Sequence, residues 1–525
     1  MNIRTVFSIL LLTSLTASSK GVELDSLLIK SVGGKKALAR IKNLKSYQMS
    51  GSINWNGLEG IYSSFFRAPD KVKITADFGT FTIEQGFDGQ SCWQKDLHGR
   101  VSDLAGFEKT ELLRSVYFMS FAYVVDRRLP GTSELLDTFV TDKNIGFSVN
   151  FYPFLNDTVA AAFEIGQNLH IIQFARLDNL IVSTELSEFK SVDSIFFPFY
   201  SLATAENTPM MTEVSVDSVV LDIDLKDSAF SKPHLTLDDF HFPADSTSVT
   251  VPCKFSNGHM MVFGEINGVK KAWFILDTGA SATYYDSKFV SELGLNPAGE
   301  LPSLGLGGFG KIRIVQVDSL KIGPLTLYNQ TAGVLPLDQL TAQVQKKTTF
   351  GGLLGYDFFM CFPVKFDFKK EEMTVYNPNN FNLPENGVSY PFHLSMMIPT
   401  IEAELNGVKG NFIIDLGNAL GLIIHPKFSE KLIGQSAIDT SKTVARNIAG
   451  IGPGIAGRII NVQSLQIGAH KLNIPEAILA ESSEGMTGSW EIAGNIGTKV
   501  LQHYAILFDY PNSRIVFYNF PDSVE

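Results

Sequence analysis

Two stretches of this chain repeat one pattern of residues. Residues 265–293 read EINGVKKAWFILDTGASATYYDSKFVSEL, and residues 403–432 read AELNGVKGNFIIDLGNALGLIIHPKFSEKL. Each stretch holds Asn-Gly-Val-Lys, a short apolar run, Asp-x-Gly, a second apolar run and then Lys-Phe. Because order and spacing agree throughout, the pattern indicates an internal duplication.

The duplication continues to the end of each copy. GLLGYDFFMCFPVKFDFKKEEMTVYN at 352–377 aligns without a gap on GNIGTKVLQHYAILFDYPNSRIVFYN at 494–519. Near the start of each segment an apolar residue precedes a glycine, Gly355 or Gly497. Each segment ends in a strand-like run that leads to an asparagine, Asn377 or Asn519. We therefore expect two related lobes, lobe one over 258–380 and lobe two over 388–525.

The apolar run of each copy leads into an acidic residue at a turn. In lobe one Asp277 is followed by Thr278, Gly279 and Ala280. A buried strand would deliver the aspartate, and glycine permits the tight turn that leaves the carboxylate exposed. An Asp-Thr-Gly triplet alone is weak evidence for a catalytic loop. Its position directly after an apolar strand makes that interpretation stronger.

Lobe two keeps part of this element. Asp415 and Gly417 stand at the equivalent positions, but Leu416 replaces the threonine and Asn418 follows the glycine. Two carboxylates held in contact share one proton and titrate as a pair. The ionised member can then activate a water, while the protonated member polarises a carbonyl group.

Lobe one resembles the retropepsin and pepsin families of aspartic proteases over residues 258–378. Three elements carry the resemblance: the Asp-Thr-Gly-Ala loop, the glycine-rich stretch GLGGFGKIRIV at 305–315, and Leu-Leu-Gly at 353–355. The resemblance implies an aspartic endopeptidase that hydrolyses polypeptides without a cofactor or metal. The implied site residues are the catalytic Asp277 and Asp415, the supporting Thr278, Gly279, Ala280 and Gly417, and the flap residues Gly305, Gly307, Gly308, Phe309 and Gly310.

Leu416 keeps three readings open. In the favoured reading, both aspartates of one chain form the catalytic pair. In the second, lobe one pairs with lobe one of another molecule and lobe two is inactive. In the third, the protein is a non-catalytic lipid- or peptide-binding protein with a degenerate protease domain. Thr278 is expected to hydrogen-bond toward the Leu416 loop, with the reciprocal bond lost.

Residues 21–230 predict a separate α+β domain. A helix-like segment, LDSLLIKSVGGKKALARI, precedes alternating stretches such as SYQMSGSINW and KVKITADF. The Gly-Gly helix, the turn at 67–71 and the Phe-Asp-Gly at 87–89 resemble the lipoprotein-carrier fold. That resemblance implies a half-open barrel with a cavity for a lipid or other apolar ligand. A linker is expected over residues 231–257, which are rich in proline and short polar residues.

The composition and the N-terminal residues indicate which partners and which location to expect. The net charge of −11 argues against a nucleic-acid partner, because phosphate contacts need clustered Lys and Arg. Residues 1–20 have the short positive, apolar and small-residue regions of a signal peptide. We expect an exported, periplasmic or secreted protein without a transmembrane span. The expected fold is mainly β: a two-lobed acid-protease β-barrel fold preceded by an α+β half-barrel, an antiparallel sheet wrapping a helix.

Overall fold

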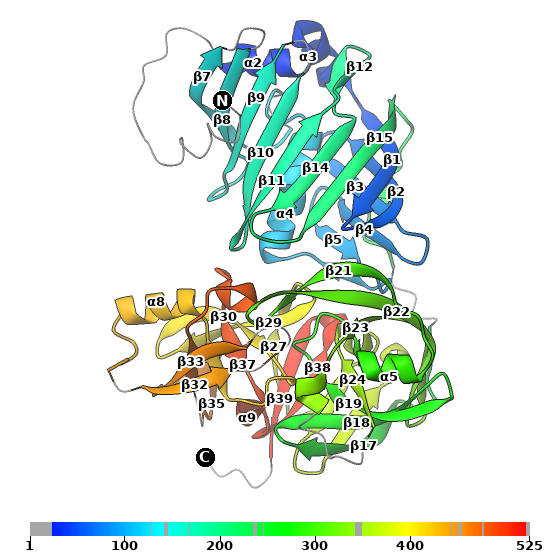
Figure 1. The fold of residues 1–525 in the computed structure, drawn as a ribbon, viewed down its shortest axis with the longest axis vertical. Helices are drawn as coiled ribbons and strands as arrows, with labels where there is room; N and C mark the ends of the chain where they lie inside the picture. The colour runs from blue at the N-terminus through cyan, green and yellow to red at the C-terminus, as the bar shows by residue number, and fades with distance from the viewer. Residues whose placement is uncertain are drawn as a thin grey trace. The chain divides into compact units, whose positions relative to one another are not determined.

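The computed structural model describes most of the chain, and the chain divides into two compact units (Figure 1). The first unit holds residues 1–103 and 107–233, and the second holds 104–106 and 234–525. The expected signal peptide, residues 1–20, lies outside the described residues. The described residues are 24–125, 128–140, 145–166, 169–234, 239–244, 246–341, 349–441, 443–448, 450, 454–474 and 477–520.

The first unit is built on one antiparallel sheet of thirteen strands, in the order β6-β5-β4-β3-β2-β1-β15-β14-β11-β10-β9-β8-β7. Its strands are β1 (Ser46–Trp55), β2 (Leu58–Arg67), β3 (Lys71–Asp77), β4 (Thr82–Phe87), β5 (Cys92–Lys95), β6 (Val101–Asp103), β7 (Thr132–Val140), β8 (Ile145–Tyr152), β9 (Val159–Ile165), β10 (His170–Leu177), β11 (Leu180–Ser187), β14 (Tyr200–Ala205) and β15 (Met211–Leu221). A separate hairpin is formed by β12 (Lys190–Val192) and β13 (Ile195–Phe197).

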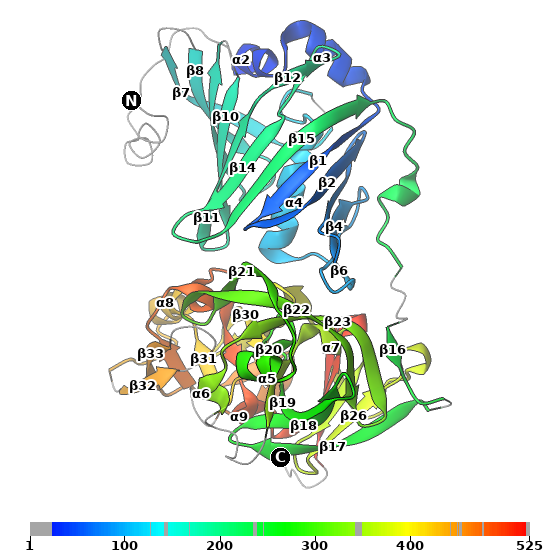
Figure 2. The ribbon, with the colours of Figure 1, turned by 45° about the vertical axis from the view of Figure 1, so that its right-hand side comes forward.

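The sheet curves around a helix, as the sequence predicts (Figure 2). The wrapped helix is α4 (Gly106–Met119), which buries Leu112, Val116 and Tyr117. The N-terminal helical segment instead forms α2 (Leu24–Ser31) and α3 (Gly34–Asn43). The break between them falls at Gly33, whose φ of 109° favours glycine.

The second unit contains two large sheets. The first runs β21-β22-β23-β20-β24-β19-β18-β17-β26-β25-β38-β39-β27, and the second runs β32-β33-β36-β31-β37-β30-β29-β34-β35. The strands are β16 (Phe240–His241), β17 (Ser248–Ser256), β18 (His259–Ile266), β19 (Lys270–Leu276), β20 (Tyr284–Asp286), β21 (Ala298–Gly305), β22 (Gly308–Ile322), β23 (Leu325–Leu335), β24 (Phe350–Leu354), β25 (Val364–Asp367), β26 (Glu372–Tyr376), β27 (Val388–Pro391), β28 (His393–Ser395), β29 (Ile398–Leu405), β30 (Val408–Ile414), β31 (Leu422–Ile424), β32 (Val444–Ile448), β33 (Ile455–Ile460), β34 (Leu465–Ile467), β35 (His470–Leu472), β36 (Ala477–Ala480), β37 (Ile492–Ile496), β38 (Tyr504–Asp509) and β39 (Arg514–Asn519).

Short helices connect these strands. They are η1 (Asp227–Ala229) in the first unit, and α5 (Ser287–Glu292), α6 (Asp338–Thr341), α7 (Tyr356–Phe359), η2 (Pro378–Asn380), α8 (Pro426–Gly434), η3 (Gly485–Gly488), α9 (Thr498–Leu501) and η4 (Tyr510–Asn512) in the second. Among the described residues, no helix is both long and apolar enough to cross a membrane.

The two lobes repeat one topology, which confirms the duplication. In lobe one β19 pairs in parallel with β24, and β20 pairs antiparallel with β24 and parallel with β23. In lobe two β30 pairs in parallel with β37, and β31 pairs antiparallel with β37 and parallel with β36. The hairpins β25–β26 and β38–β39 join through β25 and β38, so one sheet passes between the lobes.

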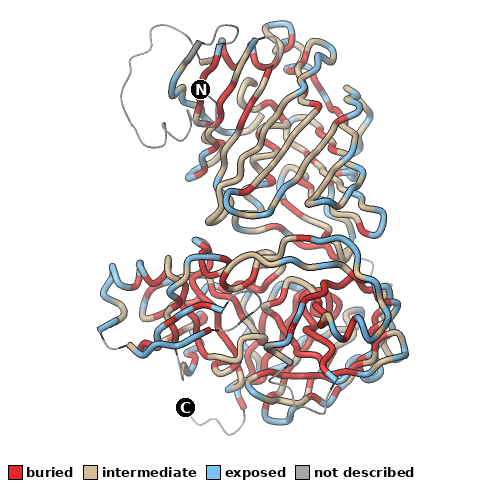
Figure 3. The backbone as a smooth tube through the Cα atoms, in the orientation of Figure 1, coloured by how far each residue is buried: buried red, intermediate tan, exposed pale blue. Residues whose placement is uncertain are grey.

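The lobes also share one hydrophobic core. A single apolar cluster includes Leu276 and Phe359 of lobe one together with Leu416, Ile496 and Phe508 of lobe two. Figure 3 shows buried residues throughout the strands of this unit. Burial of one continuous apolar cluster holds the two lobes together without a partner chain.

Much of the expected linker, 231–257, belongs to the second unit. β17 occupies Ser248–Ser256 and pairs antiparallel with both β26 and β18. Val251 and Cys253 point into the core, while Thr250 and Pro252 are exposed. This alternation is that of a half-buried strand, and Pro252 is tolerated although it cannot donate a backbone hydrogen bond.

Candidate active site

Each aspartate follows a fully buried strand end. β19 ends at Leu276, and the backbone N–H of Asp277 donates to the Leu354 carbonyl of β24 at 2.9 Å. β30 ends at Ile414, and the N–H of Asp415 donates to Ile496 of β37 at 3.0 Å. The same parallel pairing therefore fixes both Asp-x-Gly loops at the edge of their lobes.

The two loops lie against each other. A Cβ atom built on Gly279 would be 2.4 Å from the carboxyl carbon of Asp415. A Cβ on Gly417 would be 2.3 Å from the carboxyl carbon of Asp277. Both positions must be glycine, because no side chain fits at these separations. The duplicated fold thus brings the two predicted aspartates into contact within one chain.

Thr278 ties the two loops together from the lobe-one side. Its hydroxyl donates to the Ile414 carbonyl at 2.8 Å and accepts from the Leu416 N–H at 2.9 Å. Thr278 is fully buried, so both bonds are shielded from water. The hydrogen bond expected from Thr278 toward the Leu416 loop is therefore present.

Leu416 has a packing role in place of a hydroxyl. Its side chain is fully buried in the core shared by the two lobes. Its carbonyl accepts from the Thr498 hydroxyl at 3.2 Å, and that hydroxyl also lies 2.9 Å from the Asn418 carbonyl. Thr498 thus supports the loop of lobe two from within its own lobe.

Burial and the neighbouring carboxyl shift the ionisation of Asp277. Burial raises the pKa of the Asp277 carboxyl well above its usual range, and the charge of Asp415 and a hydrogen bond with it raise it further. Backbone N–H groups of Gly279 and Ala280 act in the opposite direction. A carboxyl with a raised pKa beside a second carboxylate is the arrangement that retains a single proton.

Two asparagines at this site were not predicted from the sequence. Asn495 donates from Nδ2 to Oδ2 of Asp415 at 2.6 Å, and Asn418 donates from Nδ2 to Oδ1 of Asn495 at 2.8 Å. Asn495 occupies the place of Leu353 in lobe one. That replacement of an apolar residue by an amide, in a strand whose other residues are apolar or glycine, is a signal readable from the repeat alone.

The glycine-rich stretch forms the hairpin expected of a flap. β21 and β22 meet at Gly305 and Gly308 around a turn at Leu306 and Gly307, and Phe309 and Gly310 continue β22. Gly308 has φ of 145°, which disfavours any residue with a Cβ.

The tip of this hairpin reaches lobe two. The Leu306 side chain packs on the apolar cluster of Ile423, Ile448, Ile455, Ile478 and Ala480. The Thr487 N–H of η3 donates to the Leu306 carbonyl at 3.4 Å. Lobe two has a glycine-rich stretch of its own, GIGPGIAGRII at 450–460, of which residues 451–453 lie outside the described residues.

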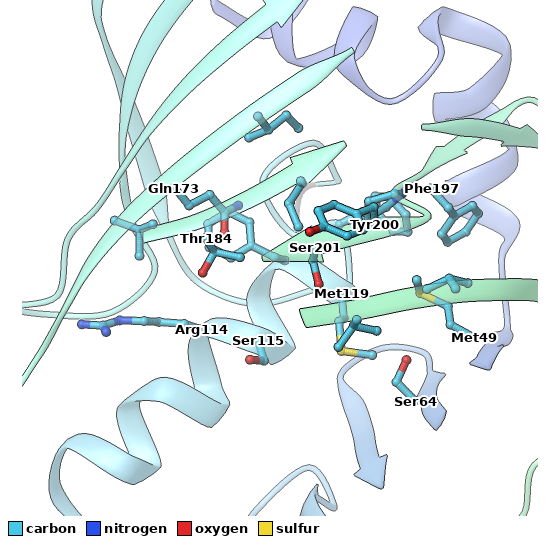
Figure 4. A pocket seen from close by; sticks show the side chains of 18 of the residues that line it. Met49, Ser64, Arg114, Ser115, Met119, Gln173, Thr184, Phe197, Tyr200 and Ser201 are labelled. Atoms are coloured by element: carbon cyan, nitrogen blue, oxygen red, sulfur yellow. The ribbon is translucent and has the colours of Figure 1, made fainter. Parts of the chain in front are cut away.

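The first unit contains a cavity of about 330 Å³ between α4 and the sheet. Figure 4 shows Ser115 and Met119 of α4 facing Thr184 and Ser201 of the sheet. Most of its lining is aromatic or aliphatic, with a few hydroxyls. Arg114 lines it as well, but its guanidinium binds the Asp157 carboxylate at 3.0 Å.

No cluster of metal-ligating side chains occurs among the described residues of either unit.

Comparisons with known proteins find similarity to parts of the chain. A family model described as aspartyl protease matches residues 262–358. No curated protein sequence matches the chain. A solved aspartic proteinase from Irpex lacteus is similar at 12% identity, over 52% of this chain and 98% of that chain, with a TM-score of 0.33.

Two further solved structures are similar to parts of the chain. A retropepsin-like aspartic protease from Rickettsia conorii is 19% identical over 25% of this chain and 90% of that chain, with a TM-score of 0.18. A DUF1329 family protein from Desulfovibrio piger is 13% identical over 39% of this chain and 95% of that chain, with a TM-score of 0.28. The family match identifies residues 262–358 of lobe one as similar to aspartyl proteases, and lobe two repeats the strand topology of that lobe.

Proposed function

We propose that the protein is an exported aspartic endopeptidase whose catalytic pair is Asp277 and Asp415 of one chain. One observation carries the proposal: each carboxyl lies against the loop glycine of the other lobe. Two carboxylates at one point, with a single proton between them, supply both a base and an acid.

The proposed reaction uses one water between the pair. The ionised carboxylate takes a proton from the water as its oxygen bonds to the carbonyl carbon of the peptide. The protonated carboxyl gives its proton to the carbonyl oxygen, so the tetrahedral intermediate forms without a free oxyanion. The carboxyl that took the water proton then gives it to the amide nitrogen. As the C–N bond breaks, a hydroxyl of the intermediate gives its proton to the other carboxylate, which restores the pair with one proton.

The single-chain site is favoured over a dimer of lobe one. The Thr278 hydroxyl binds Ile414 and Leu416, so a second copy of lobe one would have to displace lobe two to reach the same atoms. The core that runs through both lobes opposes such a separation, because opening it would expose apolar side chains. The loop glycines kept in both lobes favour a working pair over a degenerate domain.

Residues 1–20 are proposed to direct export before they are removed. Their positive, apolar and small-residue regions support this part of the proposal. The mass of the protein recovered from an exporting host should correspond to cleavage near residue 20. Recovery only of the full-length chain inside the cell would contradict export.

Digestion of a mixed peptide library tests the activity. Purified protein should cut internal peptide bonds, and pepstatin, which mimics the tetrahedral intermediate, should suppress the products. A library left intact across the range from acid to neutral pH would refute the peptidase.

For the first unit we propose a binding function: its cavity takes one apolar ligand about the size of a single acyl chain. A volume of about 330 Å³ lies at the lower end of pockets that hold small molecules, roughly 300–1,000 Å³. The lining of aromatic and aliphatic side chains suits an apolar occupant, and the charge of Arg114 is already matched by Asp157.

Filling the cavity should remove this binding. Thr184→Trp places an indole among the lining residues and should weaken binding of a fluorescent fatty acid by about tenfold or more. Ser183→Trp is the matched control, because strand neighbours face opposite sides and the Ser183 hydroxyl meets Thr204 of β14 at 3.0 Å. Equal dissociation constants for the two variants, measured by fluorescence titration, would exclude the cavity as the binding site.

A further inference from the structure

The two carboxyls of the proposed pair receive unequal hydrogen bonds. Oδ1 of Asp415 accepts from the N–H of Gly417 at 2.7 Å and of Asn418 at 3.1 Å, and Oδ2 accepts from Asn495 Nδ2 at 2.6 Å. Asp277 accepts backbone N–H bonds from Gly279 and Ala280. Of the two, only Asp415 receives a side-chain amide as well, and both of its oxygens are occupied by N–H donors.

The direction of these bonds is set by the backbone. The Leu420 N–H can only donate, and it donates to Oδ1 of Asn418 at 2.9 Å. That bond turns the NH₂ group of Asn418 toward Oδ1 of Asn495. The NH₂ group of Asn495 is thereby turned toward Asp415. A proton on either oxygen of Asp415 would compete with an N–H donor already bound there, which disfavours the neutral form.

Lobe one lacks this relay. Leu353, the counterpart of Asn495, is buried in an apolar cluster with Ile275, Ala280 and Tyr284. Ala280 stands where lobe two has Asn418. The amides are therefore found in only one of the two loops, which occupy equivalent places in the repeated topology.

We propose that the Asn418–Asn495 relay assigns the roles of the pair: Asp415 is the ionised base and Asp277 carries the proton. This inference rests on the proposed peptidase function and adds the direction of proton transfer to it. Asp415 removes the proton from water, and Asp277 gives its proton to the carbonyl oxygen of the substrate. Asn495 and Asn418 act through Asp415 and are positioning residues.

Other titratable groups beside the Asp277 loop supply no positive charge. Burial, and to a smaller extent the charge of Asp277, raises the pKa of Tyr284 of β20, and Tyr510 of η4 donates to the Thr278 carbonyl at 3.4 Å. Asp357 of α7 lies behind this loop and accepts from the Thr283 N–H. Each of these groups is neutral or negative, so none stabilises an anion by its charge. The raised pKa of Asp277 agrees with a proton held on that side.

Asn495→Leu tests the relay by installing the lobe-one residue. Loss of the donor makes Asp415 easier to protonate, so the acid limb of the kcat/KM profile should move up by about one pH unit. The alkaline limb, which reports loss of the Asp277 proton, should move less. Asn418→Ala should move the acid limb in the same direction by a smaller amount. Asn473→Leu, an exposed position in the same lobe, should leave both limbs in place.

A titration that needs no cleavage separates this inference from the peptidase itself. With Asp labelled by ¹³C at the side-chain carboxyl, the full-length chain should show Asp415 ionising at lower pH than Asp277, and Asn495→Leu should raise the Asp415 transition. The variants D277N and D415N assign the two resonances.

The outcomes are distinct. Asp277 ionising first, or an acid limb unchanged in Asn495→Leu, would overturn the assignment even in an active enzyme. The expected titration in a chain that cleaves no peptide would refute the peptidase and support the hydrogen-bond assignment.

Discussion

Replacing either aspartate by asparagine should abolish peptide cleavage, with kcat/KM falling by at least about 10³-fold in both D277N and D415N. An amide at either position can neither hold the shared proton nor accept one from water. Both losses are expected because the two carboxyls meet across the loop glycines of a single chain. The measurement is the rate of hydrolysis of one peptide substrate by each purified variant.

The fold of both variants should be unchanged, since asparagine retains the shape of aspartate and can keep the bonds to the loop N–H groups. Far-ultraviolet circular dichroism and the thermal transition check this control. An active D415N with an inactive D277N would favour the dimer of lobe one. If both variants are as active as the wild type, the two aspartates are not catalytic, and the non-catalytic binding protein remains as the alternative.

Thr278→Val should destabilise the second unit strongly and reduce activity. Valine keeps the branched shape but removes the hydroxyl, so the Ile414 carbonyl and the Leu416 N–H lose a buried partner. Each unsatisfied buried group costs about 1–3 kcal/mol, so the two groups predict a loss of about 2–6 kcal/mol in the free energy of unfolding. Urea denaturation measures this loss.

The catalytic effect of Thr278→Val should follow from misplaced loops, with kcat reduced by about tenfold or more. Thr278→Ser is the matched control, because it keeps the hydroxyl and should stay within about 1 kcal/mol of the wild type. Equal stability of the Val and Ser variants would show that the two bonds contribute nothing to the joining of the loops.

The repeat allowed the lobes and the site to be predicted from the sequence. Duplicated apolar runs before Asp277 and Asp415 specify the same strand pairing twice, and a conserved pairing places both loops at equivalent points. Gly279 and Gly417 were readable as turn residues, and the structure adds that each makes room for the opposite carboxyl. The local sequence pattern therefore identifies the residues of the site. The symmetry of the duplicated fold explains why the two aspartates are in contact.

Other features depend on contacts that no local pattern reveals. Asn418 and Asn495 meet although 77 residues separate them, and only the contrast with Leu353 marks the position. Leu306 lies in a glycine-rich turn, yet it packs on the apolar cluster of lobe two.

Two elements were not predicted from the sequence. α4 buries only Leu112, Val116 and Tyr117, because other residues of the helix line the cavity, so its helical periodicity is weak. The segment that forms β17 was predicted to belong to a linker because it contains Pro252 and follows a stretch of short polar residues, although its apolar residues alternate.

Counting active sites tests the single-chain pair most directly. The wild type, shown to be monomeric by light scattering, is titrated with pepstatin at a chain concentration far above the dissociation constant, and residual hydrolysis is followed. A site built from Asp277 and Asp415 of one chain predicts that activity reaches zero at one inhibitor molecule per chain. An end point at one inhibitor per two chains, with activity confined to a dimer, would contradict it.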